Sequence, residues 1–272
     1  MDAKNAFVSV NALHVDTDGS VWVVDTGAPR FGEGPVSDGT KIVQVDPLTD
    51  RVLRIYRLSG SALRPNSYVD DIRIRGRRAY LTDAGAGAII VLDLDRGAAR
   101  RRFDRQSFTK ALPDARIIVN GKVLSAPNGS ILRVNADDIE LSSDGKYLYF
   151  GPLSGPLYRV ETRFLEDDRL DDEAVAAHVE KWFDMPAVGG IALAKEGGLY
   201  FSQVDDNSLK RRNPDGSVTV LARDPRLRWV DAPFIDKNGY VYLPAAQLDG
   251  ASIFNHSHST MTMPVQLFRV KP

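Results

Sequence analysis

The chain of 272 residues contains no cysteine, so disulfide bonds, thiol catalysis and cysteine-ligated metals are excluded. Long apolar runs are missing as well, since no stretch approaches the ~20 residues that span a bilayer. Residues 1–16, MDAKNAFVSVNALHVD, lack the basic segment and the apolar stretch of a signal peptide. The sequence by itself therefore leaves the localisation of the protein open.

An excess of either charge is also missing, because 35 Lys and Arg residues face 36 Asp and Glu residues for a net charge of -1. Without a basic field, we expect neither nucleic acid nor a membrane as a partner. The motifs G-x-S-x-G, H-E-x-x-H and the P-loop are absent from the sequence. We therefore expect no organic cofactor, and a serine hydrolase, a zinc protease or a nucleotide-binding protein has no motif to support it.

What the sequence does contain is a repeated hairpin pattern, found in residues 11–27, 70–85, 137–155, 189–207 and 231–247. Each copy has an alternating apolar run, a turn with Gly beside Asp, Lys or Asn, and a second run that holds an aromatic residue. Two further strand-like runs follow several copies, as KIVQVD and RVLRIY follow the first. The repeat predicts an all-β fold, a β-propeller of four-stranded antiparallel blades with five blades visible. A β-sandwich also has many short strands, but it gives no reason for the repeat.

Two segments interrupt the repeat inside what we expect to be a single domain over residues 1–272. Residues 103–136 contain RIIVNGKVLS, whose Asn-Gly pair predicts a hairpin, and we expect this insertion to stand over the mouth of the propeller. Residues 164–183, FLEDDRLDDEAVAAHVEKWF, begin with acids and carry apolar residues at nearly helical spacing. This second insertion is predicted to be helical.

Acidic and amide side chains gather at one edge of the predicted blades. The inner strand of an antiparallel blade begins at the edge where the second strand ends, so these positions in every unit line one common mouth. Trp229 lies two residues before an inner strand and is close enough in sequence to reach the same mouth. The expected ligand-binding residues are Asn11, Asp25, Asp70, Asp83, Asp137, Gln203, Trp229 and Gln247.

Three further carboxylates, Asp71, Asp138 and Asp231, come from different units and are the expected metal ligands. Carboxylates that converge without compensation repel one another, and a hard cation relieves the repulsion. Ca²⁺ or another divalent cation fits, because Ca²⁺ prefers six to eight oxygen ligands. The alternative is that these acids accept backbone N–H bonds and simply close the loops between blades.

Several phrases together resemble the major royal jelly protein/Yellow family in its bacterial form. They include LHVDTDGSVWVVDTGAP, AYLTDAGAGAIIVLDL, LSSDGKYLYFGPLSGPLYRVET and the closing LFRVKP, and the likeness runs over nearly the whole chain. More distantly the chain is similar to the gluconolactonase-like propellers of the senescence-marker-protein-30 group. The resemblance implies a six-bladed propeller whose central mouth binds a small ligand, and it suggests a secreted or periplasmic protein.

Two departures from the family pattern affect these expectations. The resemblance implies that the first blade of the family form is not represented in this chain, either because the chain is truncated or because the ring closes with five blades or in an oligomer. An open blade edge would then predict self-association. Gly189 and Gly190 stand where the family often has an acid, which removes one potential metal ligand.

Three functions therefore remain open from the sequence. The first is binding of a small polar or cationic molecule in the acidic mouth. The second is a metal-dependent hydrolase of lactones or esters, in the manner of the gluconolactonase-like group. The third is a non-catalytic structural or interaction domain.

Overall fold

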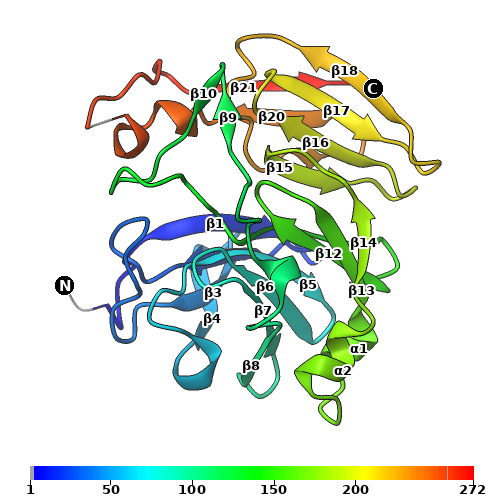
Figure 1. The fold of residues 1–272 in the computed structure, drawn as a ribbon. Coiled ribbons are helices and arrows are strands. Elements are labelled where there is room, and N and C mark those ends of the chain that lie inside the picture. The colour runs from blue at the N-terminus through cyan, green and yellow to red at the C-terminus, as the bar shows by residue number, and fades with distance from the viewer. Residues whose placement is uncertain (1–2, 256) are drawn as a thin grey trace.

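The computed structural model describes residues 3–255 and 257–272, which form antiparallel sheets arranged around one axis (Figure 1). The first two sheets are blade 1, with β1 (Val10–Val15), β2 (Val21–Asp25), β3 (Lys41–Asp46) and β4 (Arg51–Arg57), and blade 2, with β5 (Val69–Arg75), β6 (Arg78–Asp83), β7 (Ala88–Asp93) and β8 (Ala99–Arg102). The next two are blade 3, with β11 (Ala136–Leu141), β12 (Tyr147–Pro152), β13 (Leu157–Glu161) and β14 (Glu180–Phe183), and blade 4, with β15 (Val188–Leu193), β16 (Leu199–Gln203), β17 (Ser208–Arg212) and β18 (Val218–Arg223). Blade 5 has three strands, β19 (Phe234–Ile235), β20 (Val241–Ala245) and β21 (Gln266–Val270).

The predicted β-propeller is confirmed, and its five hairpins are the inner two strands of the five blades. Aromatic residues of the second strands pack where two blades meet. Trp22 and Tyr56 of blade 1 lie in one buried cluster with Ile72 and Leu81 of blade 2. Each further pair of neighbouring blades shares a cluster of the same kind, so the core is a series of apolar layers between sheets.

The predicted helix over residues 164–183 is wrong in its extent. The segment holds two short helices, α1 (Thr162–Glu166) and α2 (Asp172–Ala176), and then strand β14. Asp171 starts α2 by accepting a hydrogen bond from the Ala174 N–H. Trp182, at the C-terminal end of this segment, lies in β14, where its ring packs edge-on against Tyr149 with the ring centroids 4.8 Å apart. Packing in the sheet overrides the local helical pattern.

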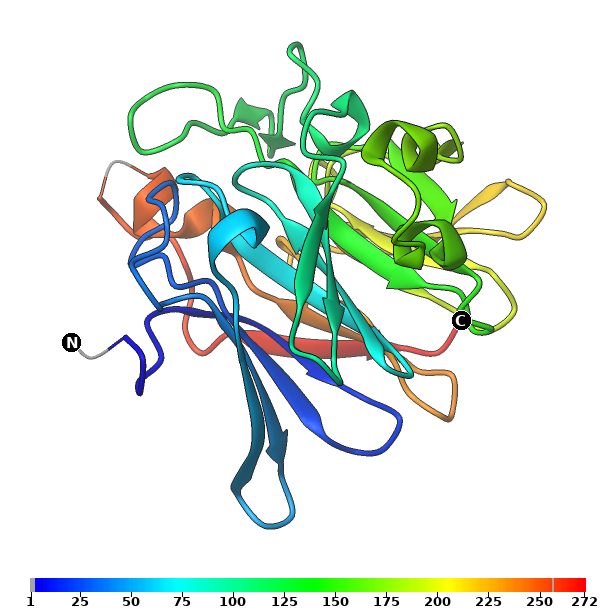
Figure 2. The same cartoon turned by 90° about the horizontal axis from the view of Figure 1, so that it is seen from below.

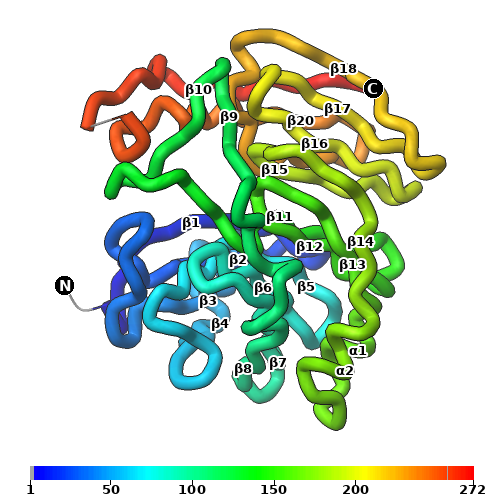
Figure 3. Tube along the Cα trace, viewed as in Figure 1, coloured from blue at the N-terminus to red at the C-terminus, as the bar shows by residue number. Residues whose placement is uncertain are grey.

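The insertion over residues 103–136 contains a small hairpin, β9 (Ile118–Val119) and β10 (Lys122–Val123), which turns at Asn120 and Gly121. Both turn residues have positive φ, 49° and 77°, as a two-residue hairpin turn of the primed type requires. Figures 1 and 3 show this segment in green, crossing in front of the ring.

Blade 1 and blade 5 are the two ends of the ring, with β1 below β20 and β21 in Figure 1, and Figure 2 shows the same arrangement from below. Their loops meet at one edge, where the Phe31 and Phe254 rings pack edge-on with the centroids 5.8 Å apart. Among the helices of the described residues, none has the length and apolar character needed to cross a membrane.

Candidate functional site

The inner strands are irregular at the same place in four of the blades. The pairing of the inner strand with its neighbour shifts at Asn11 in β1, at Asp70 and Asp71 in β5, at Asp137 in β11, and at Gly189 and Gly190 in β15. A β-bulge re-aims the side chains beside it and is common next to binding sites. The bulges thus explain how adjacent acids such as Asp70 and Asp71 can both face the axis, which a regular strand does not allow.

These bulged positions enclose a small pocket of about 50 Å³ on the axis, which we call the acidic pocket. Its lining is Asp70, Asp71, Arg73, Asp137, Asp138, Ile139, Gly189, Gly190, Ile191, Asp231 and Ala232. Five carboxylates from three blades therefore share this space with one arginine. The volume holds a few water molecules or one small charged group, because a water needs roughly 15 Å³ on this measure and drug-sized ligands occupy about 300–1,000 Å³.

Arg73 compensates only part of this negative charge. Its guanidinium donates to Asp71 Oδ2 at 2.7 Å and to Glu140 Oε1 at 3.0 Å. Asp71 Oδ1 accepts the Ile72 N–H at 2.7 Å, so both oxygens of this carboxylate have partners. The remaining carboxylates of the pocket, Asp70, Asp137, Asp138 and Asp231, receive no hydrogen bond or ion pair from Arg73.

The uncompensated negative charge of these carboxylates is reflected in their pKa values. Burial, followed by the charges of neighbouring aspartates, raises the pKa of Asp70, of Asp137 and of Asp138 well above the usual value. Burial and then the charge of Asp71 raise the pKa of Asp231 to about 7. At neutral pH the pocket therefore retains protons unless another positive charge replaces them.

Asp138 is the most buried of the five carboxylates, with 5% of its surface exposed. Its Oδ2 atom is fully buried and has no hydrogen-bond partner among the described residues. A buried carboxylate oxygen without a donor costs free energy, so this atom marks a place where a ligand would be stabilised. Asp70, by contrast, accepts a hydrogen bond from Asn11 Nδ2 at 2.6 Å.

Gly189 and Gly190 belong to the pocket for a steric reason. A Cβ at Gly189 would lie 2.3 Å from the Val230 carbonyl oxygen, and one at Gly190 would lie 2.7 Å from the Ala232 nitrogen. Blade 5 approaches blade 4 too closely here for any side chain. The missing acid noted in the sequence is thus a consequence of how these two blades pack.

An apolar cluster lies beside the acidic pocket at the edge where the inner strands begin, and we call it the cap cluster. Its buried members are Ala84, Ile117, Val119, Leu124, Leu132, Val134, Leu153, Val204 and Trp229. The β9–β10 segment supplies the middle of this set and the blades supply the rest. In three blades, a residue that belongs to this cluster or packs against it precedes a pocket acid by two or three positions along the chain. Tyr68 precedes Asp70 in this way, and Trp229 precedes Asp231. The cap cluster covers this end of the axis, and the resulting exclusion of water is consistent with the raised pKa values.

Six of the predicted site residues lie outside the lining of the acidic pocket, and one of them, Asn11, donates a hydrogen bond to the pocket residue Asp70. Trp229 is 3% exposed and belongs to the cap cluster. Gln247 exchanges two hydrogen bonds of 2.9 Å with the backbone of Thr262. Gln203 accepts a hydrogen bond from Lys210 Nζ at 2.7 Å and donates one to Asp205 at 2.6 Å.

Asp25 and Asp83, the other two, are fully buried and serve the loop-closing role that the sequence left open as an alternative. Asp25 pairs with Lys41 at 2.7 Å and accepts the Val8, Ser9 and Gly27 N–H groups. Burial acts to raise the pKa of Asp25, but the Lys41 ammonium and these N–H groups outweigh it and hold the pKa below its usual value. Asp83 pairs with Arg101 in the same way. The aspartates at the ends of the second strands therefore stabilise their own blades, whereas the aspartates at the starts of the inner strands line the axis.

Arg73 and Glu140 are the site residues that the sequence analysis missed. A signal for them existed, because each follows a pocket acid by two positions in an inner strand, in DIR and DIE. Residues two apart in a strand share a face, so both had to point to the axis. His14 faces Arg73 and Asp71 as well, and burial, followed by the charge of Arg73, lowers its pKa to about 4.

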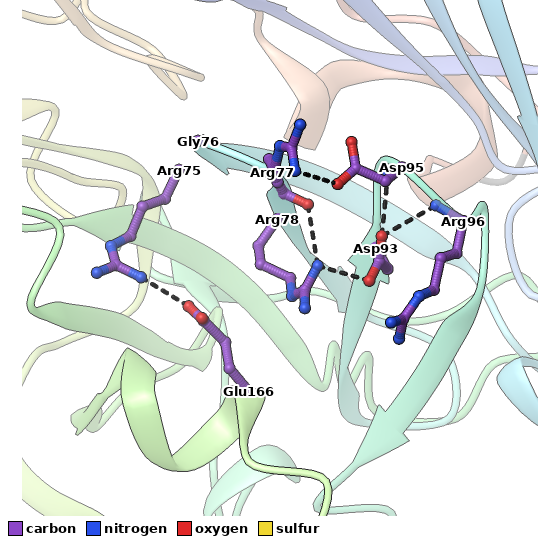
Figure 4. A pocket seen from close by; sticks show the side chains of 8 residues that line it. All are labelled: Arg75, Gly76, Arg77, Arg78, Asp93, Asp95, Arg96 and Glu166. Atoms are coloured by element: carbon purple, nitrogen blue, oxygen red, sulfur yellow. Dashed lines mark hydrogen bonds and ion pairs between the residues drawn. The ribbon is translucent and has the colours of Figure 1, made fainter.

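A larger hollow of about 580 Å³ lies at the opposite ends of these strands (Figure 4). The figure shows Arg75 directed at Glu166, Arg77 at Asp95 and Arg78 at Asp93, and the pairs are 2.7–3.0 Å apart. Arg77 is 80% exposed in its side chain. Paired and solvated charges of this kind are typical of a protein surface, so the acidic pocket is the better candidate for a functional site.

Comparison with known proteins supports the fold and identifies the family. Residues 8–269 match the family model described as major royal jelly protein. Protein yellow of Drosophila melanogaster is 28% identical over 185 residues, which are 64% of this chain and 33% of that protein, and protein yellow of Drosophila simulans matches equally. The chain thus spans about a third of the length of these curated relatives.

Solved structures at low sequence identity show the same fold and nothing more. Virginiamycin B lyase from Staphylococcus aureus has a TM-score of 0.55 at 13% identity, over 98% of this chain and 71% of that one. A chain of the nidogen/laminin complex has a TM-score of 0.55 at 14% identity, over 95% and 82%. Because the family match covers almost all of the propeller, the chain belongs to the major royal jelly protein family.

Proposed function

We propose that this protein binds a small cationic ligand in the acidic pocket. The observation that carries the proposal is the buried Oδ2 atom of Asp138, which has no donor among the described residues and lines a space shared by four other carboxylates. A positive group placed there would replace the protons that Asp70, Asp137 and Asp231 otherwise retain. Charge-assisted hydrogen bonds to carboxylates are about twice as strong as neutral ones.

The small volume of the acidic pocket favours a compact cation as the ligand. The pocket of about 50 Å³ admits the ammonium group of a small amine or a single metal ion, and it leaves no room for a large apolar ligand. Asp71, one of the three expected metal ligands, already has both oxygens occupied. The present side-chain arrangement therefore favours an ammonium group over the direct metal site predicted from Asp71, Asp138 and Asp231.

A metal-dependent lactonase or esterase is the second candidate, and the pKa of Asp231 favours it. A carboxylate whose pKa is about 7 is suited to act as a general base at neutral pH. In this case Asp138 and its neighbours would hold a divalent ion such as Ca²⁺, which would polarise a carbonyl group. Arg73 would hold the Asp71 side chain in place through their ion pair.

Thermal unfolding in the presence of cations tests the proposed function. At pH 7.5, a series of small primary amines and a CaCl₂ series are each added to chelator-treated protein. A ligand at about a hundred times its Kd stabilises the folded state by roughly 2.7 kcal/mol, which is about 5 °C in Tm for a chain of this length. Asp138→Asn should abolish the shift, because the amide keeps the shape of the side chain and removes its charge.

The matched control for this experiment is Asp95→Asn, which removes an exposed carboxylate in the hollow of Figure 4 and should leave the shift intact. A shift with amines alone supports the first candidate. A shift with Ca²⁺, together with turnover in a lactone and ester panel, supports the second. If neither series moves the Tm of the parent, the proposal is wrong.

A further inference from the structure

Residues 112–134, which we call the crossing segment, pass in front of the ring and contribute to the cap cluster (Figures 1 and 3). Among the described residues, each backbone-to-backbone hydrogen bond of this segment joins two of its own residues, as Leu124 N–H donates to the Ile117 carbonyl at 2.9 Å. Within the same part of the chain, one hydrogen bond links the segment to a blade, from Asn207 Nδ2 to Asn120 Oδ1 at 3.2 Å. The crossing segment therefore satisfies its own backbone and depends little on polar contacts with the propeller.

Apolar packing holds the crossing segment against the blades. Its buried side chains meet Ala84, Leu153, Val204 and Trp229 in the cap cluster, and they are Ile117, Val119, Leu124, Leu132 and Val134. Apolar contacts are not directional, and parting them leaves no backbone donor or acceptor without its partner. The segment can therefore move away from the blades as one unit, at a smaller cost in free energy than unfolding of the whole chain.

Both ends of the crossing segment are fastened at the turn between β6 and β7. Asn135 Oδ1 accepts the Ala111 N–H at 3.1 Å, which ties the two ends together. Asn135 Nδ2 donates to the Gly85 carbonyl at 2.8 Å, and the Asn135 N–H donates to the Ala84 carbonyl at 2.9 Å. Fixed ends and an apolar body are what a hinged loop over a binding site requires.

The acidic pocket lies directly behind this segment. Val134, in the crossing segment, stands three residues before the pocket acid Asp137. Farther along the axis, the ion pair of Arg73 with Glu140 at 3.0 Å occupies the space beyond the pocket. A ligand that approaches along the axis therefore meets the crossing segment on one side and a buried ion pair on the other.

We propose that the crossing segment is a lid, hinged at Ala111 and Asn135, that opens to let a cation enter and leave the acidic pocket. The identity of the ligand rests on the function proposed above, whereas the opening of the segment does not depend on it. The following two experiments separate these parts.

Thiol labelling measures the opening without a ligand, because the chain has no cysteine of its own. Val119→Cys places a thiol under the crossing segment, where Val119 is 3% exposed. The matched control, Val160→Cys, places one between blades 2 and 3, where Val160 is 1% exposed. We expect Val119→Cys to react with iodoacetamide roughly 100-fold faster or more, because it needs local opening and the control needs two blades to separate.

A reversible cross-link tests whether the opening is the route of the ligand. Asn120→Cys/Asn207→Cys is joined by a short bifunctional methanethiosulfonate, and binding of ethylammonium chloride or CaCl₂ is followed by stopped-flow tryptophan fluorescence. The cross-link should slow binding by roughly 10-fold or more, and dithiothreitol should restore the rate of the parent. The matched control is Ser125→Cys/Ile131→Cys, which joins two residues paired within the crossing segment and should bind at the parent rate.

Equal labelling rates for Val119→Cys and Val160→Cys overturn the lid, whatever the pocket binds. Unchanged binding rates in the protein cross-linked between positions 120 and 207 overturn it as well, because the ligand then enters by another route. If neither cation binds to the parent, the function proposed above is wrong, and the labelling rates still decide whether the segment opens. Labelling uses neither Asn120 nor Asn207, so it decides the matter without the double variant.

Discussion

Replacing Asp83 with alanine is expected to lower the free energy of unfolding by about 3–5 kcal/mol. The Asp83 side chain is fully buried and accepts hydrogen bonds from Ser67 Oγ at 2.6 Å and from Arg101 Nη1 at 2.6 Å. It also accepts the N–H groups of Tyr68, Gly85 and Ala86. Without the carboxylate, the Arg101 guanidinium is left buried with one partner fewer, and the turn after β6 loses its acceptor.

Chemical denaturation of the variant measures this loss. The matched control is Asp95→Ala, which breaks the exposed pair with Arg77 at 3.0 Å and should cost about 0–1 kcal/mol. A loss no larger than that of the control would show that Asp83 does not fasten blade 2. In thermal unfolding, the expected loss corresponds to a decrease in Tm of roughly 6–15 °C.

The second prediction is that, without added cation, the acidic pocket makes the protein less stable as the pH rises from about 4 to about 7. An aspartate in the unfolded chain titrates near 3.9, whereas Asp231 in the folded protein titrates at about 7. Between these values the folded state holds more protons than the unfolded state, so the free energy of unfolding falls with rising pH. The contribution is fully present below about pH 4 and is lost by about pH 7, and it amounts to on the order of 2–4 kcal/mol.

His14 acts in the opposite direction and has to be separated from this effect. Its pKa is lowered from 6.5 to about 4 in the folded state, so its contribution to stability is lost as the pH falls through that range. The difference between the parent and Asp138→Asn removes the His14 contribution, because both proteins contain this residue. Asp138→Asn should have a shallower pH dependence and, at pH 8, a higher Tm than the parent.

Urea denaturation between pH 4 and pH 8 provides the measurement, and Asp95→Asn provides the matched control with an unchanged pH profile. Equal profiles for the parent and Asp138→Asn would mean that the pocket carboxylates are not coupled to folding. A cation that occupies the pocket should remove the difference at pH 8 and have little effect near pH 4, where protons already compensate the charge.

The local patterns of the sequence were enough for the blades and for the residues at the inner-strand starts. Alternating apolar runs around Gly-containing turns predicted all five inner hairpins, and the strand-end argument placed Asp70, Asp71, Asp137, Asp138 and Asp231 at one edge. The helix predicted over residues 164–183 failed because the spacing of apolar residues does not reveal that residues 180–183 pair with β13. Strand pairing is a long-range contact, and local spacing carries little information about it.

The separation of Asp25 and Asp83 from the pocket acids could not be predicted from the sequence. All of these residues are aspartates at strand ends. The roles of Asp25 and Asp83 differ from those of the pocket acids through Lys41, on the neighbouring strand β3, and Arg101, on the outer strand β8 of blade 2. A buried carboxylate beside a fixed cation is a structural anchor, and one without such a cation is available to a ligand.

By itself, the sequence determined the repeated hairpins, the propeller that they build and the set of acids at its inner strands, because these follow from side-chain alternation and turn chemistry within a few residues. Only the tertiary structure decided which acids share the axis and that the cap cluster covers them. The physical reason is that charge compensation and burial depend on neighbours from other blades, and the chain brings those neighbours together only when the ring forms.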